Sequence, residues 1–584
     1  MLHFHYSWNA IIVALLGSVA VVLAAAPGTA AELQILAATT PSEKADFDVY
    51  FPVRDPDGLK ALIESQNRPG SPDYHKWLTP QQFAERFGPT EATIAQVTAE
   101  LAAHGLTVTE QLGQKLHVAA SAAAVEAAFA VRLSHGRYSD GTETLVADGA
   151  LVMLPALAAS GALIPQFTTL PPFQKHSRPL GPAVRPVPFN AISPTGPYLT
   201  SDLRQAYDYP SAQAITAKGV RIGILMAGDF NPPDMLQYWN ALGLPASLQP
   251  SVVSIPVDGG SAFDPQNSFE THLDIQQSGG MSLGATIGLY NLPDLTFAST
   301  IDGLNRIDND NIADVVNMSF GLSEYQYDAN NLTQFIVQQD QLFAQGTVQG
   351  ITFVASSGDH GAFEIVNGQP VFSPQYPASD PLVVAVGGTN LVTAHAAGNA
   401  NSAYVWEEAW PDPESGGGIW GSAGGISIFF PKPYYQYWVP TQSAQFRTVP
   451  DLAGHMGGCP SDAVSCNPFD SSDFEFIGGQ WEGVIGTSAS APDFVGLVAL
   501  WVAIRGGGPQ GRLGLIHPYI YGLAYNQNHG NSTFYRHSNI HGNNGYPTTV
   551  PYDLVIGNGT VDGRQFLGVT VLPPAGNPGT LSNP

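Results

Sequence analysis

The sequence predicts an α/β protein with two folded modules, a smaller α+β module over residues 32–170 and a larger module over residues 198–584. In the larger module, short and almost continuous apolar runs alternate with helical stretches. Such runs are typical of parallel strands buried on both faces, which predicts a doubly wound parallel sheet with its catalytic loops at the carboxyl ends of the strands. The expected strands are Val220–Met226, Ala285–Tyr290, Val315–Met318, Ile351–Ala355 and Leu382–Val386.

The smaller module mixes strands and helices in an order that favours a compact α+β fold of its own. Its last expected helix is rich in alanine and begins beside Ser121, a residue that can cap it. The expected elements are a strand at 48–51, a helix at 56–66, one or two helices within 80–104, a strand pair within 106–118 and a helix at 121–131.

A proline-rich segment separates the two modules. Residues 171–197 contain eight prolines in 27 residues, together with three basic side chains. Such a segment cannot form a helix and favours an extended, exposed conformation. We therefore expect a linker here, and a site of proteolytic cleavage.

The N-terminal segment 1–31 has the pattern of a secretory signal. An apolar run over residues 7–25 is followed by small residues ending at Ala31, with no charged side chain before Glu32. A basic start is missing and the run is close to spanning length, so a membrane anchor is the alternative. No other apolar run approaches about 18 residues. We expect a secreted protein, with the periplasm as the alternative, and no stable membrane association after the signal is removed.

The composition limits the classes of partner. Apolar residues make up 44 % of the chain, enough for a large core, and the formal net charge of −26 argues against nucleic acid as a partner. Only 22 residues are Lys or Arg, which limits charge repulsion in acid and permits service at low pH. The two cysteines, Cys459 and Cys466, can form one local disulfide in an exported protein; two unrelated thiols are the alternative.

One segment has the pattern of a serine nucleophile. Gly486-Thr487-Ser488-Ala489-Ser490 precedes an apolar helical run, and a serine at a helix start lies near the positive end of the helix dipole. The alternative is that Ser488 and Ser490 merely cap the helix. A nucleophilic serine also needs a base. The sequence has no His-Gly-Thr-His segment of the subtilisin type. His541-Gly542-Asn543 is the nearest echo but lies after the serine, and the isolated His272 and His360 are more readily ordinary polar residues.

Carboxylates are the better candidates for the acid and base groups. Glu270 and Asp274 are four residues apart, so on a helix they share one face and can hold a proton between them. Asp359 follows an apolar strand and the turn Ser356-Ser357-Gly358; if protonated, it can donate a hydrogen bond to a developing oxyanion. The alternatives are an exposed acidic helix face for the pair, and a turn aspartate bonded to its own backbone for Asp359.

Together these segments resemble the sedolisins, or serine-carboxyl peptidases, in their kumamolisin-like proenzyme form with a pro-kumamolisin activation domain. The resemblance covers nearly the whole chain after the signal. Beyond the segments above, it includes Ser71–Pro80 in the smaller module and, in the larger one, Asn317–Gly321, Tyr376–Ser379, Ala385–Thr389, Gly424–Ser427 and Arg447–Asp451.

The resemblance implies a subtilisin-like catalytic domain preceded by a ferredoxin-like inhibitory prodomain. It implies that Ser488 is the nucleophile, Glu270 its general base, Asp274 the group that orients Glu270, and Asp359 the protonated acid of the oxyanion hole. Serine attack would give an acyl-enzyme that water hydrolyses. The implied partners are peptide or protein substrates and the protein's own propeptide, which would be removed on acidification by cleavage within 171–197.

The resemblance also implies a calcium site near the C-terminus, which the family builds from an Asp-Ile pair and a Gly-x-Gly-x-Asp segment. Here Asn539 and Ile540 stand at the pair and Asp553 ends the segment. Asn539 replaces a carboxylate, and Thr549 and Pro551 stand where glycines are usual. Because backbone carbonyls can still bind, calcium is expected, but more weakly than in relatives.

The leading interpretation is a secreted, acid-acting endopeptidase made as a self-processing zymogen. A tripeptidyl-peptidase of the same family is the first alternative, because the motifs do not report whether the substrate cleft is closed at one end. A catalytically silent binding protein with the same fold is the second. Subtilisin-like catalysis through histidine is the third, and the pH–rate profile discriminates it.

Overall fold

The computed structural model describes residues 31–183, 196–330, 332–366, 369–394, 402–412, 420–458, 471–530, 533–537 and 540–568. The segment 1–30, Cys459, Cys466 and Asn539 lie outside these ranges. The expected signal, disulfide and asparagine ligand therefore stay predictions.

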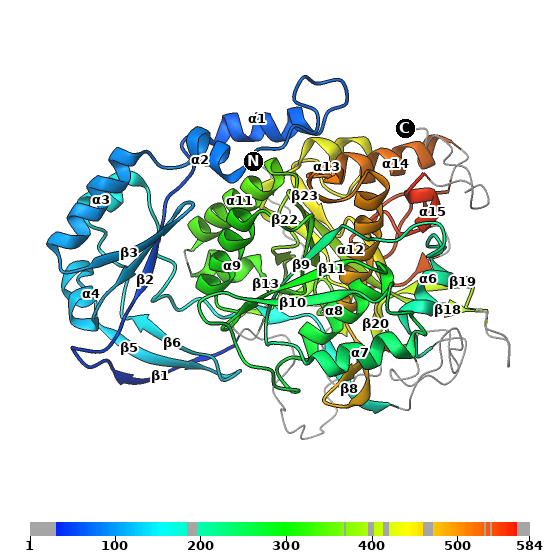
Figure 1. Cartoon of the computed structure of the whole chain (residues 1–584), viewed down its shortest axis with the longest axis horizontal. Coiled ribbons are helices and arrows are strands. Elements are labelled where there is room, and N and C mark those ends of the chain that lie inside the picture. Colours follow the sequence, from blue (N-terminus) through cyan, green and yellow to red (C-terminus); the bar gives the residue numbers. More distant parts are fainter. Residues whose placement is uncertain are drawn as a thin grey trace, which may run out of the picture.

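The larger module is built on one sheet that is parallel over most of its width (Figure 1). Strand pairing is parallel at each step from β10 to β29, and β27 adds an antiparallel edge. The order is β10 (Ser251–Pro256), β11 (Thr286–Leu292), β9 (Arg221–Ala227), β12 (Val315–Met318), β14 (Thr352–Ser356), β18 (Val383–Thr393), β24 (Leu452–His455), β29 (Thr560–Val561) and β27 (Tyr535–Arg536). β19 (Tyr404–Ala409) pairs with β18, and β28 (Ile540–His541) pairs with β19.

The structure confirms the expected fold class, and each of the five expected strands overlaps a strand of this sheet. The edge strand β10 was not expected. Its residues alternate between exposed and partly buried positions, so it lacks the continuous apolar run of a central strand.

Helices flank the sheet. α8 (Phe269–Met281) packs against α12 (Thr487–Ile504) and the sheet, while α9 (Phe297–Asp310) and α11 (Thr333–Val348) form a second packed pair. The remaining described helices of this module are α6 (Thr200–Ala206), α7 (Pro232–Ala241), α10 (Glu324–Ala329), α13 (Gly508–Gly511), α14 (His517–His529), α15 (Gly563–Phe566) and a 3-10 turn at Tyr434–Trp438.

α12 corrects one expectation about apolar runs. It is 18 residues long and apolar enough, by length and composition, to cross a membrane, although no second run near that length was expected. In the structure 83 % of this stretch is buried inside the protein, where α12 contacts several strands of the sheet. Its apolar character is therefore explained as that of a core helix.

The smaller module lies beside the larger one, with α1 against α11 (Figure 1). Its six strands form two three-stranded antiparallel sheets, ordered β2–β4–β3 and β1–β5–β6, rather than one ferredoxin-like sheet. Ser121 caps α4 as expected, accepting a hydrogen bond from the Ala124 amide. The elements are β1 (Leu33–Ala38), β2 (Phe47–Tyr50), α1 (Pro56–Gln66), α2 (Pro80–Phe87), α3 (Glu91–Ala103), β3 (Thr107–Leu112), β4 (Lys115–Ala119), α4 (Ala122–Phe129), β5 (Leu133–Tyr138), β6 (Glu143–Ala147) and α5 (Pro155–Ser160).

The first half of the proline-rich segment is mostly buried or half-buried, with Pro179 and Pro182 exposed, which corrects the expectation of an exposed linker. It forms two short strands, β7 (Gln174–Lys175) and β8 (Arg178–Ala183), that pair with strands of the larger module. Phe173 and His176 have exposed fractions of 3 % and 1 %. The partner strands and the other small strands are β13 (Phe320–Ser323), β15 (Phe363–Val366), β16 (Gln369–Phe372), β17 (Gln375–Tyr376), β20 (Pro411–Asp412), β21 (Trp420–Gly421), β22 (Gly425–Pro431), β23 (Phe446–Val449), β25 (Asp473–Ile477) and β26 (Gln480–Ile485).

The core of the larger module contains buried acidic side chains that lack hydrogen-bond partners within the described part of the chain. The carboxyl oxygens of Asp473, Glu475 and Asp493 have no hydrogen-bond partner among the described residues. Burial raises the pKa of all three well above the usual range, and the mutual repulsion of Asp473 and Asp493 adds to the effect on Asp473. These groups are therefore protonated in the folded protein at acidic pH.

We expect the folded larger module to lose stability as the pH rises above about 4, the ordinary carboxyl pKa. Each such group contributes a loss of about 1.4 kcal/mol per pH unit while the pH lies between its unfolded and folded pKa. Thermal unfolding of the inactive Ser488→Ala protein from pH 4 to 7 would measure this. Asp493→Asn should flatten the slope, whereas the exposed Asp328→Asn should leave it unchanged; equal slopes would contradict the account.

Candidate functional site

The four candidate catalytic residues come from three elements that meet at the carboxyl end of the sheet. Glu270 and Asp274 lie on α8, Ser488 lies in the first turn of α12, and Asp359 follows β14. All four side chains are buried, with exposed fractions of 2 % or less. Ser488 is covered, because the linker segment passes over it.

Glu270 and Asp274 share one face of α8, as their spacing predicts. Burial raises the pKa of Glu270 to about 7, against the opposing influence of hydrogen bonds from Ser177 and Ser488. Burial and the charge of Glu270 raise the pKa of Asp274 well above its usual range. Asp274 Oδ1 accepts a hydrogen bond of 2.6 Å from Ser319 Oγ, which fixes its orientation. The pair is therefore a site that retains a proton.

Ser488 does not cap its helix. The N-cap is Gly486, whose φ of 139° lies in the region that favours glycine, and no side-chain cap is present. Ser488 Oγ donates a 3.4 Å hydrogen bond to the carbonyl oxygen of Ser319. The same hydroxyl lies close enough to Glu270 to lower the pKa of that carboxyl. Ser490, by contrast, donates to two backbone carbonyls within the fold.

The two carboxyl oxygens of Asp359 differ in their hydrogen bonding. Its Oδ1 accepts hydrogen bonds from the Thr487 amide at 2.9 Å and the Thr487 hydroxyl at 2.8 Å. Its Oδ2 has no partner among the described residues. Burial raises the pKa of Asp359 well above its usual range, more strongly than the Thr487 hydrogen bonds lower it. A protonated Oδ2 is thus available as a hydrogen-bond donor.

The linker places a peptide bond of the chain itself at Ser488. The Ser488 amide donates a 2.9 Å hydrogen bond to the carbonyl oxygen of His176, and the Ser177 hydroxyl donates to Glu270 Oε2. A Cβ atom on Gly486 would lie 2.3 Å from this carbonyl oxygen and 2.7 Å from Asp359 Oδ2, so only glycine fits between them. The carbonyl of His176 therefore lies in a recess formed by Gly486, the Ser488 amide and Asp359.

Extended backbone pairing holds the chain on both sides of this bond. Before it, Gln174 and Lys175 pair with Gly321 and Phe320 of β13. After it, residues 178–183 pair antiparallel with β26. Sequence reasoning located the linker but not its path, because the proline content predicts extended backbone without indicating which surface receives it.

Two family models match the chain in this order. One, described as "Pro-kumamolisin, activation domain", matches residues 32–159, and one described as "Subtilase family" matches residues 260–505. The chain is 31 % identical over 488 residues to sedolisin from Pseudomonas sp. (strain 101), which covers 81 % of this chain and 78 % of the relative. The chain belongs to the sedolisin family.

Further comparisons agree with this membership. Kumamolisin from Bacillus sp. (strain MN-32) is 29 % identical over 80 % of this chain and 81 % of its own length. Tripeptidyl-peptidase 1 from Rattus norvegicus is 26 % identical over 85 % and 84 %. A solved structure of Pseudomonas sedolisin, described as a serine-carboxyl proteinase in complex with pseudo-iodotyrostatin, superposes with a TM-score of 0.53 and 27 % identity, covering 65 % of this chain and 97 % of that one. This chain is therefore a peptidase of the sedolisin family with a zymogen activation domain.

None of the three histidines weighed as a base has a hydrogen bond to Ser488 among the described residues. His272, on α8, accepts a hydrogen bond from the Asn231 amide and bonds to the Phe476 carbonyl. His360 packs near the ring of Trp420. His541 lies in β28 and is exposed. The Glu270 carboxyl, rather than one of these imidazoles, interacts with the Ser488 hydroxyl.

The predicted calcium ligands divide between described and undescribed residues. Asp553 Oδ1 accepts hydrogen bonds from the amides of Val555 and Ile556 at 2.8 Å, and its Oδ2 accepts from Thr549 at 3.1 Å and lies 3.3 Å from the His537 ring. N–H groups therefore face this carboxylate from several sides, where a calcium ion needs oxygen ligands.

Ile540 pairs in β28, and the described part of the chain contains no group of three His, Cys, Asp or Glu side chains able to hold a metal ion. Calcium binding through Asn539, Ile540 and Asp553, with backbone carbonyls as further ligands, stays a prediction.

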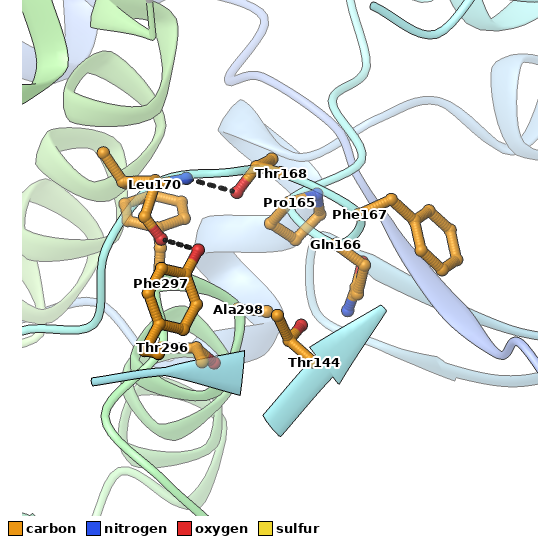
Figure 2. A pocket seen from close by; sticks show the side chains of 10 residues that line it. Thr144, Pro165, Gln166, Phe167, Thr168, Leu170, Thr296, Phe297 and Ala298 are labelled. Atoms are coloured by element: carbon orange, nitrogen blue, oxygen red, sulfur yellow. Dashed lines mark hydrogen bonds between the residues drawn. The ribbon is translucent and has the colours of Figure 1, made fainter. Parts of the chain in front are cut away.

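A separate, small hollow lies where the two modules meet (Figure 2). Thr144 and Phe167 line it from the smaller module, and Thr296 and Phe297 from the start of α9. The hydroxyl of Tyr138 donates to the Leu170 carbonyl beside it. The hollow contains none of the candidate catalytic residues. It is a seam between the modules, apart from the candidate catalytic residues.

Proposed function

We propose that this sedolisin is a secreted, acid-acting serine-carboxyl endopeptidase that matures by cleaving its own linker between His176 and Ser177. The observation that carries the proposal is the 2.9 Å hydrogen bond from the Ser488 amide to the His176 carbonyl. A backbone amide beside a nucleophilic serine is a standard donor of an oxyanion hole. Secretion rests on the N-terminal signal pattern of the sequence.

The same arrangement gives each group a role in the reaction. Ser488 Oγ attacks the His176 carbonyl carbon while the ionised form of Glu270 accepts the hydroxyl proton; Asp274, whose pKa is raised by burial and by the charge of Glu270, stays protonated beside it. The oxyanion that forms accepts hydrogen bonds from the Ser488 amide and from protonated Asp359. Collapse breaks the C–N bond as Glu270 passes its proton to the Ser177 nitrogen, which releases the Ser177 amine and leaves the His176 carbonyl carbon joined to Ser488 Oγ as an ester. Water then attacks the ester and the new carboxylate is released.

The path of the linker favours endopeptidase over tripeptidyl-peptidase action. Counting back from the proposed bond, His176, Lys175 and Gln174 occupy the three positions that a tripeptidyl-peptidase would fill. The chain continues in contact with the protein beyond them, since the Phe173 amide donates a 2.9 Å hydrogen bond to the Leu295 carbonyl. A cleft that accepts a fourth residue does not require a free amino terminus at the third.

Processing at one bond is the direct test of this proposal. On acidification, the intact mass of the purified zymogen should fall to that of a product beginning at Ser177, and N-terminal sequencing should read Ser-Arg-Pro-Leu. Any later trimming would follow this first product in time. An unprocessed chain that is fully active would contradict the zymogen proposal, and a first cut elsewhere would contradict the assigned bond.

A buried ion cluster joins the activation domain to the catalytic module and should set the pH at which the zymogen opens. Lys115 Nζ of β4 lies 2.9 Å from Asp302 of α9 and 3.6 Å from Asp48 of β2, and all three side chains are buried. Burial alone would raise the pKa of Asp48, but hydrogen bonding to His117 and the charge of Lys115 hold this pKa below its usual value. Burial raises the pKa of Asp302.

Protonation of both acids therefore leaves Lys115 as a buried cation without a counter-charge, which weakens the contact between the modules in acid. Replacing Lys115 by methionine leaves the acids without a cation at neutral pH. We expect activation of Lys115→Met to begin at higher pH than in the wild type, as followed by gel analysis across a pH series. Lys44→Met, which removes an exposed lysine paired with Asp46, is the control and should activate like the wild type. An unchanged midpoint in Lys115→Met would contradict this role.

A further inference from the structure

The side chain of the residue before the proposed scissile bond is held in a polar pocket. The His176 ring is almost completely buried, with 1 % of the residue exposed. Its Nδ1 lies 2.7 Å from Ser356 Oγ and its Nε2 lies 2.5 Å from Gln375 Oε1. Both ring nitrogens thus have a hydrogen-bonding partner from the catalytic module.

The two partners are supplied by strands, and glycines make room for them. Ser356 ends the central strand β14, and Gln375 begins β17. A Cβ atom on Gly321 would lie 2.5 Å from His176 Cε1 and 2.8 Å from Gln375 Oε1. On another side, a Cβ atom on Gly358 would lie 2.9 Å from Gln375 Cδ. The Gln375 amide is therefore closely confined beside the His176 ring.

The chemistry of the two partners matches imidazole in particular. The Gln375 oxygen only accepts, so it requires an N–H at Nε2, while the Ser356 hydroxyl can either donate to Nδ1 or accept from it. An aromatic hydrocarbon or an aliphatic side chain in this pocket would leave both partners buried and unpaired. A site built to hydrogen-bond a group discriminates strongly against analogues that lack it.

We propose that Ser356 and Gln375 make this pocket selective for histidine, so that the substrates of the mature enzyme are peptides with histidine immediately before the cleaved bond. This inference rests on the proposed function, because it takes the bound linker as a substrate. It extends that function by assigning the residues that choose the substrate.

The first experiment uses the fully processed wild-type enzyme and a peptide series based on residues 173–179, Phe-Gln-Lys-His-Ser-Arg-Pro. Only the fourth position varies, as His, Phe, Leu or Asn. We expect kcat/KM for the histidine peptide to exceed that for the phenylalanine and leucine peptides by about 10²-fold. Asparagine, which is too short to reach both partners, should fall between them. Equal or better cleavage of the phenylalanine peptide would overturn the inference.

The second experiment changes the pocket. Gln375→Met keeps the side-chain volume but removes the acceptor, and it should reduce the ratio of histidine to phenylalanine cleavage by at least about tenfold, mainly through the histidine peptide. Ser356→Ala should act in the same direction. Gln375→Glu retains an acceptor oxygen and should keep the preference for histidine. An unchanged ratio in both Gln375→Met and Ser356→Ala would overturn the assignment.

The outcomes separate this inference from the function beneath it. If the wild type cleaves no peptide of the series and does not process its linker, the proposed endopeptidase function fails. If it cleaves peptides readily without favouring histidine, the function stands and the selectivity fails. The wild-type peptide series decides the matter even if a pocket variant does not fold.

Discussion

Replacing Ser488 by alanine is expected to leave the zymogen as a full-length chain in acid. The substitution removes the only atom proposed to attack the His176 carbonyl, and loss of a catalytic serine in a related type of site lowers kcat by about 10⁶-fold. Linker cleavage is the first turnover of the same site, so processing and peptide hydrolysis should disappear together. Intact-mass analysis of protein from a protease-free host, incubated at pH 4 over hours, measures this.

Ser490→Ala is the matched control for that experiment. Ser490 lies two residues further along α12, is also buried, and within the described part of the chain donates to the backbone carbonyls of Gly387 and Thr487 alone. It should still process its linker. Normal processing of Ser488→Ala would point to cleavage by another protein and would favour the catalytically silent alternative.

Replacing Asp359 should change both the rate and its pH dependence. Below its raised pKa the Asp359 carboxyl is protonated and can donate to the oxyanion; above it, the carboxylate only accepts and repels the developing negative charge. We therefore expect wild-type kcat/KM to fall as the pH rises through the raised pKa of Asp359. Asp359→Ala removes the donor and should lower kcat by about 10²–10³-fold at pH 4.

Asp359→Asn provides a test that a merely structural role would not pass. The asparagine oxygen can still accept from Thr487, and its amide can donate where Oδ2 lies, without titrating. This variant should retain more activity than Asp359→Ala at pH 4 and should lose less of it between pH 4 and 8 than the wild type does. A wild type that is fully active at pH 8, or an Asn variant with the wild-type pH profile, would contradict the role of Asp359.

The central strands and the carboxyl candidates could be predicted from sequence because each has a local pattern. β12 coincides with the expected Val315–Met318, since a strand buried on both faces needs an uninterrupted apolar run. Glu270 and Asp274 have a spacing that a helix converts into a shared face. Asp359 follows a buried strand of a parallel sheet, which is where such folds gather their functional groups.

The features that sequence reasoning missed depend on contacts between distant segments. His176 was one polar residue in a proline-rich stretch, and its burial becomes apparent only with Ser356 and Gln375 packed around it. Lys115 has no local partner to indicate that it meets Asp302 across the two modules. The surroundings of Asp553 follow from backbone amides, which every sequence contains, and so a ligand motif alone could not report them.

The seating of the linker across Ser488 has a kinetic consequence. Each molecule carries its first substrate covalently attached and already aligned, so the opening cut obeys first-order kinetics and its half-time is independent of dilution. The released activation domain is then a separate body held by contacts alone. Concentrated and dilute solutions of the zymogen should therefore cleave the linker at similar rates. They should differ greatly in the time that the activation domain takes to leave the cleft free for other peptides.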